Sequence, residues 1–153
     1  MDDVTIGNQQ PSLTDMEMGW LCGIIDGEGC IYMAKRRENE VRPGVRIAMC
    51  DHDTIEYLAE LLTKLGVSHH ITKRDGNPKK NTSDSWAIVV EGHKRVLKLL
   101  PHIAQHLVTK KRQAQVVWQF CEQRSKKWHR EAYDDSDLAL IAIAKEMNQR
   151  GAR

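Results

Sequence analysis

Residues 20–29 read Trp-Leu-Cys-Gly-Ile-Ile-Asp-Gly-Glu-Gly, an apolar helical stretch that ends in acids alternating with glycines. A helix normally ends in glycine with basic residues in its last turn, because its C-terminal carbonyls carry partial negative charge. Asp26 and Glu28 meet that negative end with the wrong sign, so a cation must compensate. A divalent metal held by Glu28 and a free backbone carbonyl would do so, since hard cations prefer oxygen ligands.

This stretch resembles the nine-residue signature of the LAGLIDADG homing endonucleases. The matching residues are Leu21-Cys22-Gly23-Ile24-Ile25-Asp26-Gly27-Glu28-Gly29. The positions identical to the signature are Leu21, Gly23, Ile25, Asp26 and Gly29. The departures are Cys22 for Ala, Ile24 for Leu, Gly27 for Ala and Glu28 for the second Asp.

Hydrophobic periodicity along the chain predicts the order α-β-β-α-β-β-α followed by C-terminal helices. Thr14 and Glu17 form a capping box that starts a helix ending near Asp26. The other expected elements are strands at 30–37 and 43–50, a helix from Asp53 to Leu65, strands at 67–74 and 85–91, and helices at 93–100, 112–127 and 134–149. Pro43-Gly44 is assigned to the end of the first turn between strands, and Pro101 is expected to break the helix at 93–100.

This order is that of the single-motif, homodimeric LAGLIDADG proteins, and the resemblance spans about residues 13–128. It implies an α+β fold with a twisted four-stranded antiparallel sheet and C-terminal helices. The length of 153 residues predicts one domain, 13–153, after a loose polar arm, 1–12. Four cysteines without metal-ligand spacing, and no signal peptide or long apolar segment, predict a cytoplasmic protein (or an organellar matrix protein if organelle-encoded) that does not bind membranes.

Basic residues are segregated along the chain, although the formal net charge is only +2. Segments 30–50, 69–80 and 94–130 contain 19 of the 23 Lys and Arg residues and only four of the 21 acids. Such segregation favours a basic surface that binds a polyanion. The alternative for 94–130 is a solvated Lys/Arg helix face, but the two shorter segments are predicted strands.

A strip of small residues runs along the first predicted helix. Gly19 and Gly23 are four residues apart, a spacing that lets two helix backbones approach closely. Glycine within a helix also costs stability, which requires a reason. We therefore expect a homodimer interface on one face, formed by Gly19, Cys22, Gly23 and Asp26, opposite Leu21, Ile24 and Ile25. The alternative is that Gly19 contacts a neighbouring strand.

The resemblance also implies a metal-dependent active site at the end of this helix. In the family, the second acid of the motif and the carbonyl of the residue before it bind the metal; these are Glu28 and Gly27 here. The cofactor would be Mg²⁺, or another divalent cation such as Mn²⁺. Asp26 is expected to cap or orient the helix end. The alternative for Glu28 is an exposed acid in a turn.

Two further catalytic positions follow from the resemblance. A polar side chain just after the second strand corresponds to Asp51, although a shift of one residue would select Cys50 or His52. A lysine in the loop before a long helix corresponds to Lys110 in the basic run 109–114. It would polarise the attacking water or the phosphate. The alternative for this run is a helix start that is simply rich in Lys and Arg.

A four-stranded sheet can lie in the major groove of DNA, where every base pair has a different donor and acceptor pattern. The strand at 67–74 has two possible phases: either His70, Thr72 and Arg74 or His69, Ile71 and Lys73 face the DNA. The predicted DNA-binding residues are Tyr32, Arg36, Arg37, Arg42, Arg46, His70, Thr72, Lys73, Arg74, Lys79, Lys80 and Ser85, with Lys111 and Arg112 on backbone phosphates.

These observations predict a site-specific, Mg²⁺-dependent DNA endonuclease that acts as a homodimer on a pseudo-palindromic duplex of roughly 20 base pairs. One alternative is an intron maturase, which resembles the same family but assists RNA splicing. Another is a DNA-binding regulator that has lost cleavage. Glu28 and Lys110 favour the enzyme, because a protein that only binds need not keep either. His69-His70 with Asn77 faintly resembles an HNH nuclease, but the remaining spacing is missing.

Overall fold

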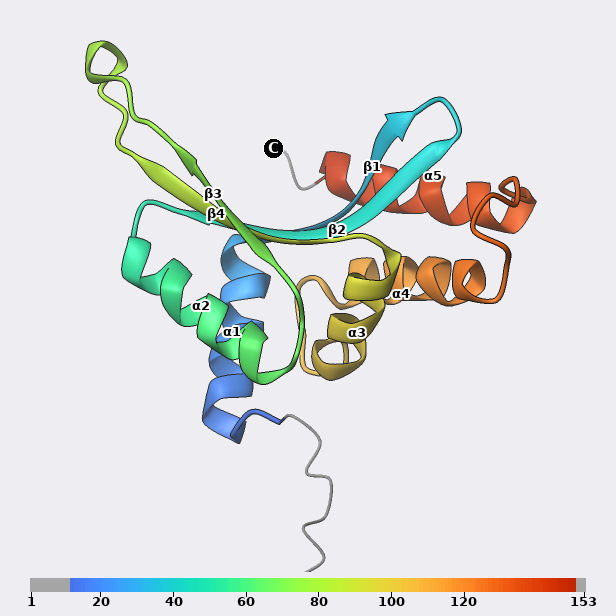
Figure 1. Cartoon of the computed structure of the whole chain (residues 1–153), viewed down its shortest axis with the longest axis horizontal. Coiled ribbons are helices and arrows are strands. Elements are labelled where there is room, and N and C mark those ends of the chain that lie inside the picture. Colours follow the sequence, from blue (N-terminus) through green and yellow to red (C-terminus); the bar gives the residue numbers. More distant parts are fainter. Residues whose placement is uncertain (1–11, 151–153) are drawn as a thin grey trace, which may run out of the picture.

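A computed structural model describes residues 12–150 as an α+β fold (Figure 1). Its elements are α1 Asp15–Glu28, β1 Gly29–Arg37, β2 Glu40–Met49, α2 His52–Lys64, β3 His70–Arg74, the short 3₁₀ helix η1 Pro78–Lys80, β4 Ser85–Glu91, α3 His93–Ile103, α4 Lys111–Ser125 and α5 Asp135–Arg150. The predicted fold class is confirmed. The predicted N-terminal arm lies outside the described residues, apart from Ser12.

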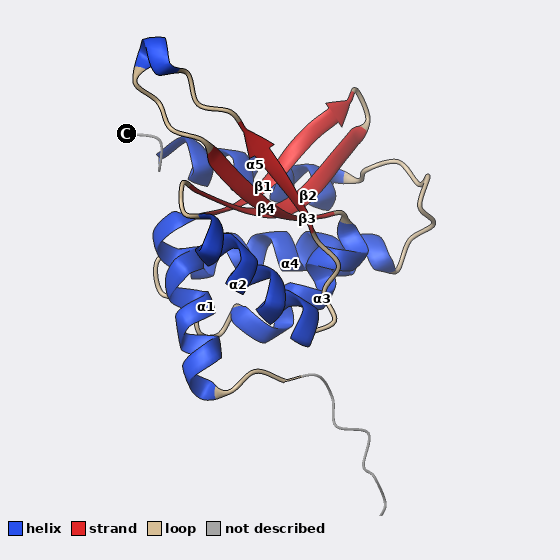
Figure 2. Ribbon diagram, turned by 60° about the vertical axis from the view of Figure 1, so that its left-hand side comes forward, coloured by secondary structure: helices blue, strands red, loops and turns tan. Residues whose placement is uncertain are grey.

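The four strands form one antiparallel sheet in the order β1-β2-β4-β3. Helices α1 to α4 lie together against one face of this sheet (Figure 2). Figure 1 shows the β1–β2 and β3–β4 hairpins rising away from these helices. The remaining long helix, α5, packs on α4 and along β1, where Asn148 donates a 3.0 Å hydrogen bond to the Ile31 carbonyl. The opposite face of the sheet is therefore available to a ligand.

The core lies between the sheet and the four helices. Because side chains alternate along a strand, Val45 and Ile47 of β2 and Ile88 and Val90 of β4 all point to the helix side and are buried there. Phe120 of α4 is fully buried in the same hydrophobic core. No helix among residues 12–150 is long and apolar enough to cross a membrane.

The capping box at the start of α1 forms as predicted. The Thr14 hydroxyl accepts the Glu17 N–H at 3.1 Å, and the Glu17 carboxylate accepts the Thr14 N–H at 3.0 Å. The helix continues two residues beyond the predicted end at Asp26, to Glu28. This extension places Glu28 on the helix itself, immediately before β1.

Two predictions based on proline were wrong. Pro43 and Gly44 lie inside β2 rather than in the turn, which is formed by Glu38 and Asn39. Proline has no N–H to donate to the neighbouring strand. Its carbonyl still takes part in the sheet, because the Pro43 carbonyl accepts the Gly92 N–H at 2.9 Å. Pro101 does not break α3, which continues to Ile103.

Pro101 is tolerated because it lies close to the end of α3. It removes one helical hydrogen bond, whereas the residues around it bury a large apolar surface. Leu99, Leu100 and Ile103 are all almost completely buried in the core. Burial of these side chains therefore outweighs the lost hydrogen bond.

Candidate functional site

The acidic end of α1 leads directly into the first strand. Glu28 is the last residue of α1, and Gly29 is both its C-cap and the first residue of β1. A Cβ at Gly29 would lie 2.7 Å from the Ile25 carbonyl oxygen, so glycine is required for this abrupt change from helix to strand. Glu28 is exposed and has no hydrogen-bond or ion-pair partner among residues 12–150. Its carboxylate is free to bind a cation.

Asp26 ties the end of α1 to the loop before α4. Its carboxylate accepts the Val108 N–H at 2.8 Å and the Lys110 N–H at 3.0 Å. Asp26 was expected to cap or orient the helix end. Both of its oxygens accept from a loop that is distant in sequence, so Asp26 fixes this loop against the helix end instead of capping the helix. This contact fixes the backbone of Lys110 at the end of α1.

The Lys110 side chain reaches the same helix end. Its ammonium group donates to the Asp26 carbonyl at 2.5 Å. A cation at this point matches the negative end of the helix dipole. Lys110 therefore supplies part of the positive charge that a metal was expected to provide at this helix end. Glu28 remains unpaired among residues 12–150. Lys111 and Arg112 follow on the exposed first turn of α4, with no acid in that turn.

The polar position after the second strand is occupied by a helix cap. Asp51 is the N-cap of α2 and accepts from the Asp53 N–H at 3.3 Å and from the Thr54 hydroxyl at 2.6 Å. Its two oxygens are therefore already hydrogen-bonded, whereas the neighbouring Cys50 and His52 side chains are exposed. His52 instead packs against Trp86, with ring centroids 4.9 Å apart.

The strand register identifies the residues that share the open face of the sheet. Directly paired residues in an antiparallel sheet point to the same side. The pairs are Cys30–Arg46, Tyr32–Gly44 and Ala34–Arg42 between β1 and β2, Gly44–Glu91, Arg46–Val89 and Ala48–Ala87 between β2 and β4, and His70–Val89, Thr72–Ala87 and Arg74–Ser85 between β3 and β4. These pairs settle the ambiguous strand: His70, Thr72 and Arg74 face the open side.

Lys73 is a correction to the predicted set, because it points to the other side of the sheet. It is paired with Trp86 in the ladder, and its ammonium group lies 5.9 Å from the centroid of the Trp86 ring. Asp75 and Asp84 accept from it in ion pairs of 3.1 and 3.5 Å. Lys79 and Lys80 lie on η1, at the outer tip of the β3–β4 hairpin.

Glu91, at the end of β4, is a charged residue of the open face that was not predicted from the sequence. Its carboxylate contacts the Tyr32 hydroxyl at 3.4 Å and the Arg36 Nε at 3.2 Å. Alternation from Ser85 through Ala87 would have placed Glu91 on this face. The network also includes Arg42, whose guanidinium lies 3.8 Å from the same carboxylate.

Only part of the predicted interface face of α1 lies at the surface of the chain. Gly19, Gly23 and Gly27 are exposed, and a Cβ added at any of them would meet nothing within 4 Å. Cys22 must be removed from this face: it is 3% exposed, and its thiol lies 3.9 Å from the Ile103 carbonyl. The helix is rotated relative to the prediction, because the core takes Cys22 together with the larger apolar residues.

Together the three glycines form the glycine strip, Gly19, Gly23 and Gly27, spaced one helical turn apart. The strip ends beside Glu28. Asp26 is half-buried against the 108–110 loop rather than lying on the strip.

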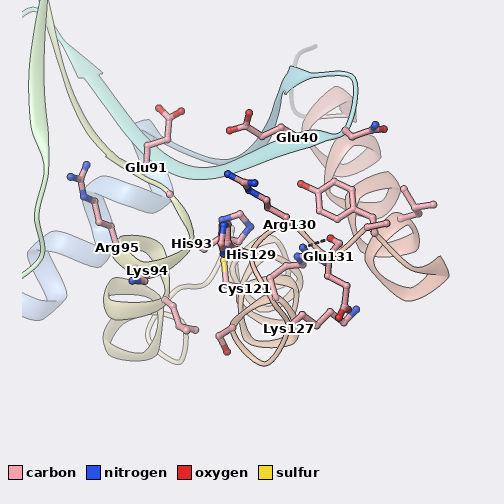
Figure 3. Close-up of a pocket in the computed structure, with 18 of the residues that line it drawn as sticks. Glu40, Glu91, His93, Lys94, Arg95, Cys121, Lys127, His129, Arg130 and Glu131 are labelled. Carbon is pink, nitrogen blue, oxygen red and sulfur yellow. Dashed lines mark hydrogen bonds between the residues drawn. The ribbon is translucent and has the colours of Figure 1, made fainter.

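A separate cavity lies on the helix side of the sheet, between α3, α4 and the loop before α5 (Figure 3). Its volume is about 980 Å³. The His93 Nε2 inside it has no hydrogen-bond partner within residues 12–150, and burial, helped by Arg124, lowers the pKa of His93. None of the predicted catalytic residues lines this cavity.

Fold and site together define the class. The protein is a single α-β-β-α-β-β-α unit in which an acidic helix end meets a lysine, beside an open sheet rich in arginine. The sequence matches the model of the LAGLIDADG-like domain over residues 15–104, and the chain belongs to this family. Lys110 lies beyond the matched range. A comparison with curated protein sequences finds no match.

Solved structures with the same fold include several homing endonucleases crystallised with DNA. The archaeal intron-encoded enzyme I-Vdi141I, complexed with DNA, is 19% identical with a TM-score of 0.67, covering 88% of this chain and 84% of that one. The homing endonuclease I-CvuI, complexed with its target in the presence of Ca, is 20% identical with a TM-score of 0.63, covering 88% and 81%. The group I intron-encoded I-CeuI, complexed with DNA, is 17% identical with a TM-score of 0.57, covering 78% and 60%. At these identities the likeness establishes the shared fold.

Proposed function

We propose that this protein is a site-specific, divalent-metal-dependent DNA endonuclease that works as a homodimer. The observation that carries the proposal is the convergence of Glu28 and Lys110 on one helix end, next to an uncovered glycine strip. Homing endonucleases of the same fold were crystallised with DNA, and I-CvuI was crystallised in the presence of Mg or Ca. These relatives support DNA as the substrate.

The helix end fits a hard divalent cation such as Mg²⁺. Glu28 offers an unpaired, exposed carboxylate. The Gly27 carbonyl is one of the last in α1, where backbone carbonyls lack helical partners. Oxygen donors of this kind are the ligands that Mg²⁺ prefers. A metal held there would activate water and stabilise the leaving oxygen of a phosphodiester.

Lys110 is the second catalytic residue of the proposal. The contacts of Asp26 with the 108–110 loop hold its backbone, and its ammonium group lies at the helix end. A fixed cation there can neutralise charge that develops on the scissile phosphate. Asp51, or alternatively Cys50 or His52, would line the site from the start of α2. Asp51 is the least free of the three, because its oxygens cap the helix.

One Glu28 per chain is too little for two scissile strands, and the glycine strip offers a way to bring two copies together. Gly19, Gly23 and Gly27 leave the backbone of α1 bare. If two α1 helices pack along this strip, their Glu28 residues arrive side by side, since the strip ends next to Glu28. Such an isologous contact has two-fold symmetry, which matches a pseudo-palindromic site.

The open sheet face supplies the base contacts of the proposal. Arg46 is exposed there, and Arg36 and Arg42 are half-exposed at the far end of the same face. Arginine binds guanine through two parallel hydrogen bonds in the major groove. Lys111 and Arg112 on α4 would bind backbone phosphates.

Substitution of Glu28 tests the proposed activity. Glu28→Gln should abolish Mg²⁺-dependent cleavage of a plasmid library while leaving DNA affinity within a few-fold, because the metal loses its charged ligand. Glu60→Gln is the matched control, since Glu60 is an exposed helical acid far from this helix end in sequence. Equal cleavage rates for Glu28→Gln and wild type would refute the assignment of the metal ligand. Binding of a defined duplex without cleavage by the wild type would favour the DNA-binding regulator.

A further inference from the structure

A polar line crosses three strands on the open face. Tyr32 of β1 pairs with Gly44 of β2, and Gly44 pairs with Glu91 of β4. A Cβ at residue 44 would overlap the Tyr32 ring. Glycine at this position therefore lets Tyr32 lie across β2 and bring its hydroxyl to Glu91, 3.4 Å away. Burial, together with Glu91, raises the pKa of Tyr32 to about 12, so the phenol stays a hydrogen-bond donor.

Two arginines converge on the same carboxylate. Arg36 donates from Nε and Nη2 to one oxygen of Glu91, and an Arg42 Nη1 lies 3.8 Å from that oxygen. Arg42 also pairs with Glu40 at 3.3 Å. The other Glu91 oxygen faces Tyr32. Both oxygens are thus engaged by side chains of β1 and β2.

Exposure shows which groups of the network can meet a ligand. The Glu91 side chain is 10% exposed, whereas Arg36 and Arg42 are 48% and 47% exposed. Figure 3 shows the Glu91 carboxylate directed away from His93 and from the cavity below the sheet. Arg36 uses one edge of its guanidinium on Glu91, so the remaining N–H groups are available on the other edge. A DNA base would meet the arginines, with the acid beneath them.

We infer that Glu91 is a specificity-determining positioning residue, which fixes Arg36 and Arg42 on the sheet so that they read guanines in the major groove. The inference rests on the proposed function, because it assumes that this face binds duplex DNA. Glu91 does not touch the bases in this arrangement; it acts through Arg36. The Glu91 carboxylate holds the planar guanidinium of Arg36 in one orientation, and the N–H groups of a guanidinium match the two acceptors of guanine.

The charge of Glu91 has a second consequence. An acid beneath the arginines weakens their attraction to any phosphate, while their orientation favours the cognate base. Removing the acid should therefore move two quantities in opposite directions. Affinity for random duplex should rise and become more dependent on salt, by roughly 0.9 in the slope of log K against log salt per half-site. Discrimination at the guanine should fall about 3-fold to 10-fold per half-site, because Arg36 is no longer held in place before binding.

The experiment compares Glu91→Gln with Glu38→Gln in the full chain. Glu38 is an exposed acid in the turn of the β1–β2 hairpin and is outside the Glu91 network, so both variants lose one negative charge from the same region. A randomised half-site library bound at several salt concentrations gives the base preference and the salt slope. We expect both variants to steepen the slope and only Glu91→Gln to lose preference at one or two base pairs. Unchanged base preference in Glu91→Gln would overturn the inference.

Two further variants keep the test decisive if Glu91→Gln folds poorly. Glu91→Asp keeps the charge but shortens the side chain, and it should lose part of the preference without steepening the salt slope. Gly44→Ala should displace Tyr32 and lower the preference while Glu91 itself remains.

An NMR measurement without DNA reports the contact alone. The Arg36 Nε–H signal should be shifted and protected in the wild type and lost in Glu91→Gln. Absence of that protected signal in the wild type would overturn the inference while leaving the proposed function standing. A wild-type chain that bound no duplex would overturn both.

Discussion

Substitution of Gly23 distinguishes a dimer interface from a bare helix surface, because the two alternatives predict opposite signs. In the isolated chain, a Cβ at Gly23 meets nothing within 4 Å. Glycine inside a helix costs about 1 kcal/mol relative to alanine. If the glycine strip faces solvent, Gly23→Ala should therefore raise the free energy of unfolding by about 1 kcal/mol, and Gly23→Leu by nearly as much.

In a closely packed dimer, the same substitutions separate the two α1 helices. Forcing a large side chain into a packed contact costs about 1–3 kcal/mol, and the cost counts twice because both copies carry the change. The dissociation constant for Gly23→Leu should then rise at least about 30-fold. Gly23→Ala should lie between wild type and Gly23→Leu.

The assay is sedimentation equilibrium over a wide concentration range, combined with urea unfolding at low and high protein concentration. Stability of a dimer depends on concentration, whereas that of a monomer does not. Glu60→Leu is the control, because it adds a leucine to an exposed position of α2. A monomeric wild type that becomes more stable in Gly23→Ala, with cleavage unchanged, would refute the reasoning for the glycine strip.

Three further outcomes are expected. In Asp26→Asn, one of the two N–H groups of the 108–110 loop loses its acceptor. The free energy of unfolding should fall by about 1–3 kcal/mol in urea titrations, and cleavage should slow more than DNA binding weakens. An unchanged cleavage rate would contradict this role of Asp26. Arg46→Ala should relax base preference at one base pair per half-site, by about 1–3 kcal/mol of discrimination. Lys111→Ala should instead weaken binding to all duplexes alike, and it should reduce the slope of log K against log salt by about one for each phosphate that is no longer bound. A library selection with the reverse pattern would contradict the binding of the sheet in the major groove. Burial lowers the pKa of His93 below 6.5, so as the pH falls the unfolded chain binds a proton at His93 before the folded chain does. The stability due to neutral His93 is therefore full above pH 6.5 and is lost as the pH falls below it. In thermal melts, His93→Gln should lose less stability than wild type between neutral and acidic pH, and an equal loss would exclude His93 as its source.

Local signals in the sequence predicted the elements of this fold well. The capping box at Thr14 and Glu17 marked the start of α1, and hydrophobic periodicity gave the order of the helices and strands. Such signals depend on spacing alone, because helix and strand periodicity set which side chains share a face. The predictions at the two prolines were wrong. Pro43 lies within β2, where its carbonyl accepts a hydrogen bond from Gly92, and Pro101 lies within α3, where burial of the neighbouring residues outweighs the lost hydrogen bond.

The acidic motif determined where to look for the site, but only the tertiary structure decided how the site is made. Cys22 is buried and Gly27 is exposed, because packing of Leu21, Cys22 and Ile25 into the core fixed the rotation of α1. Lys110 meets Asp26 across 84 positions of sequence, and Glu91 meets Arg36 across 55. Helix and strand periodicity do not predict contacts between residues so far apart in the sequence. Partners of this kind are chosen by strand register and helix packing, which bring distant charges together only after the core has formed.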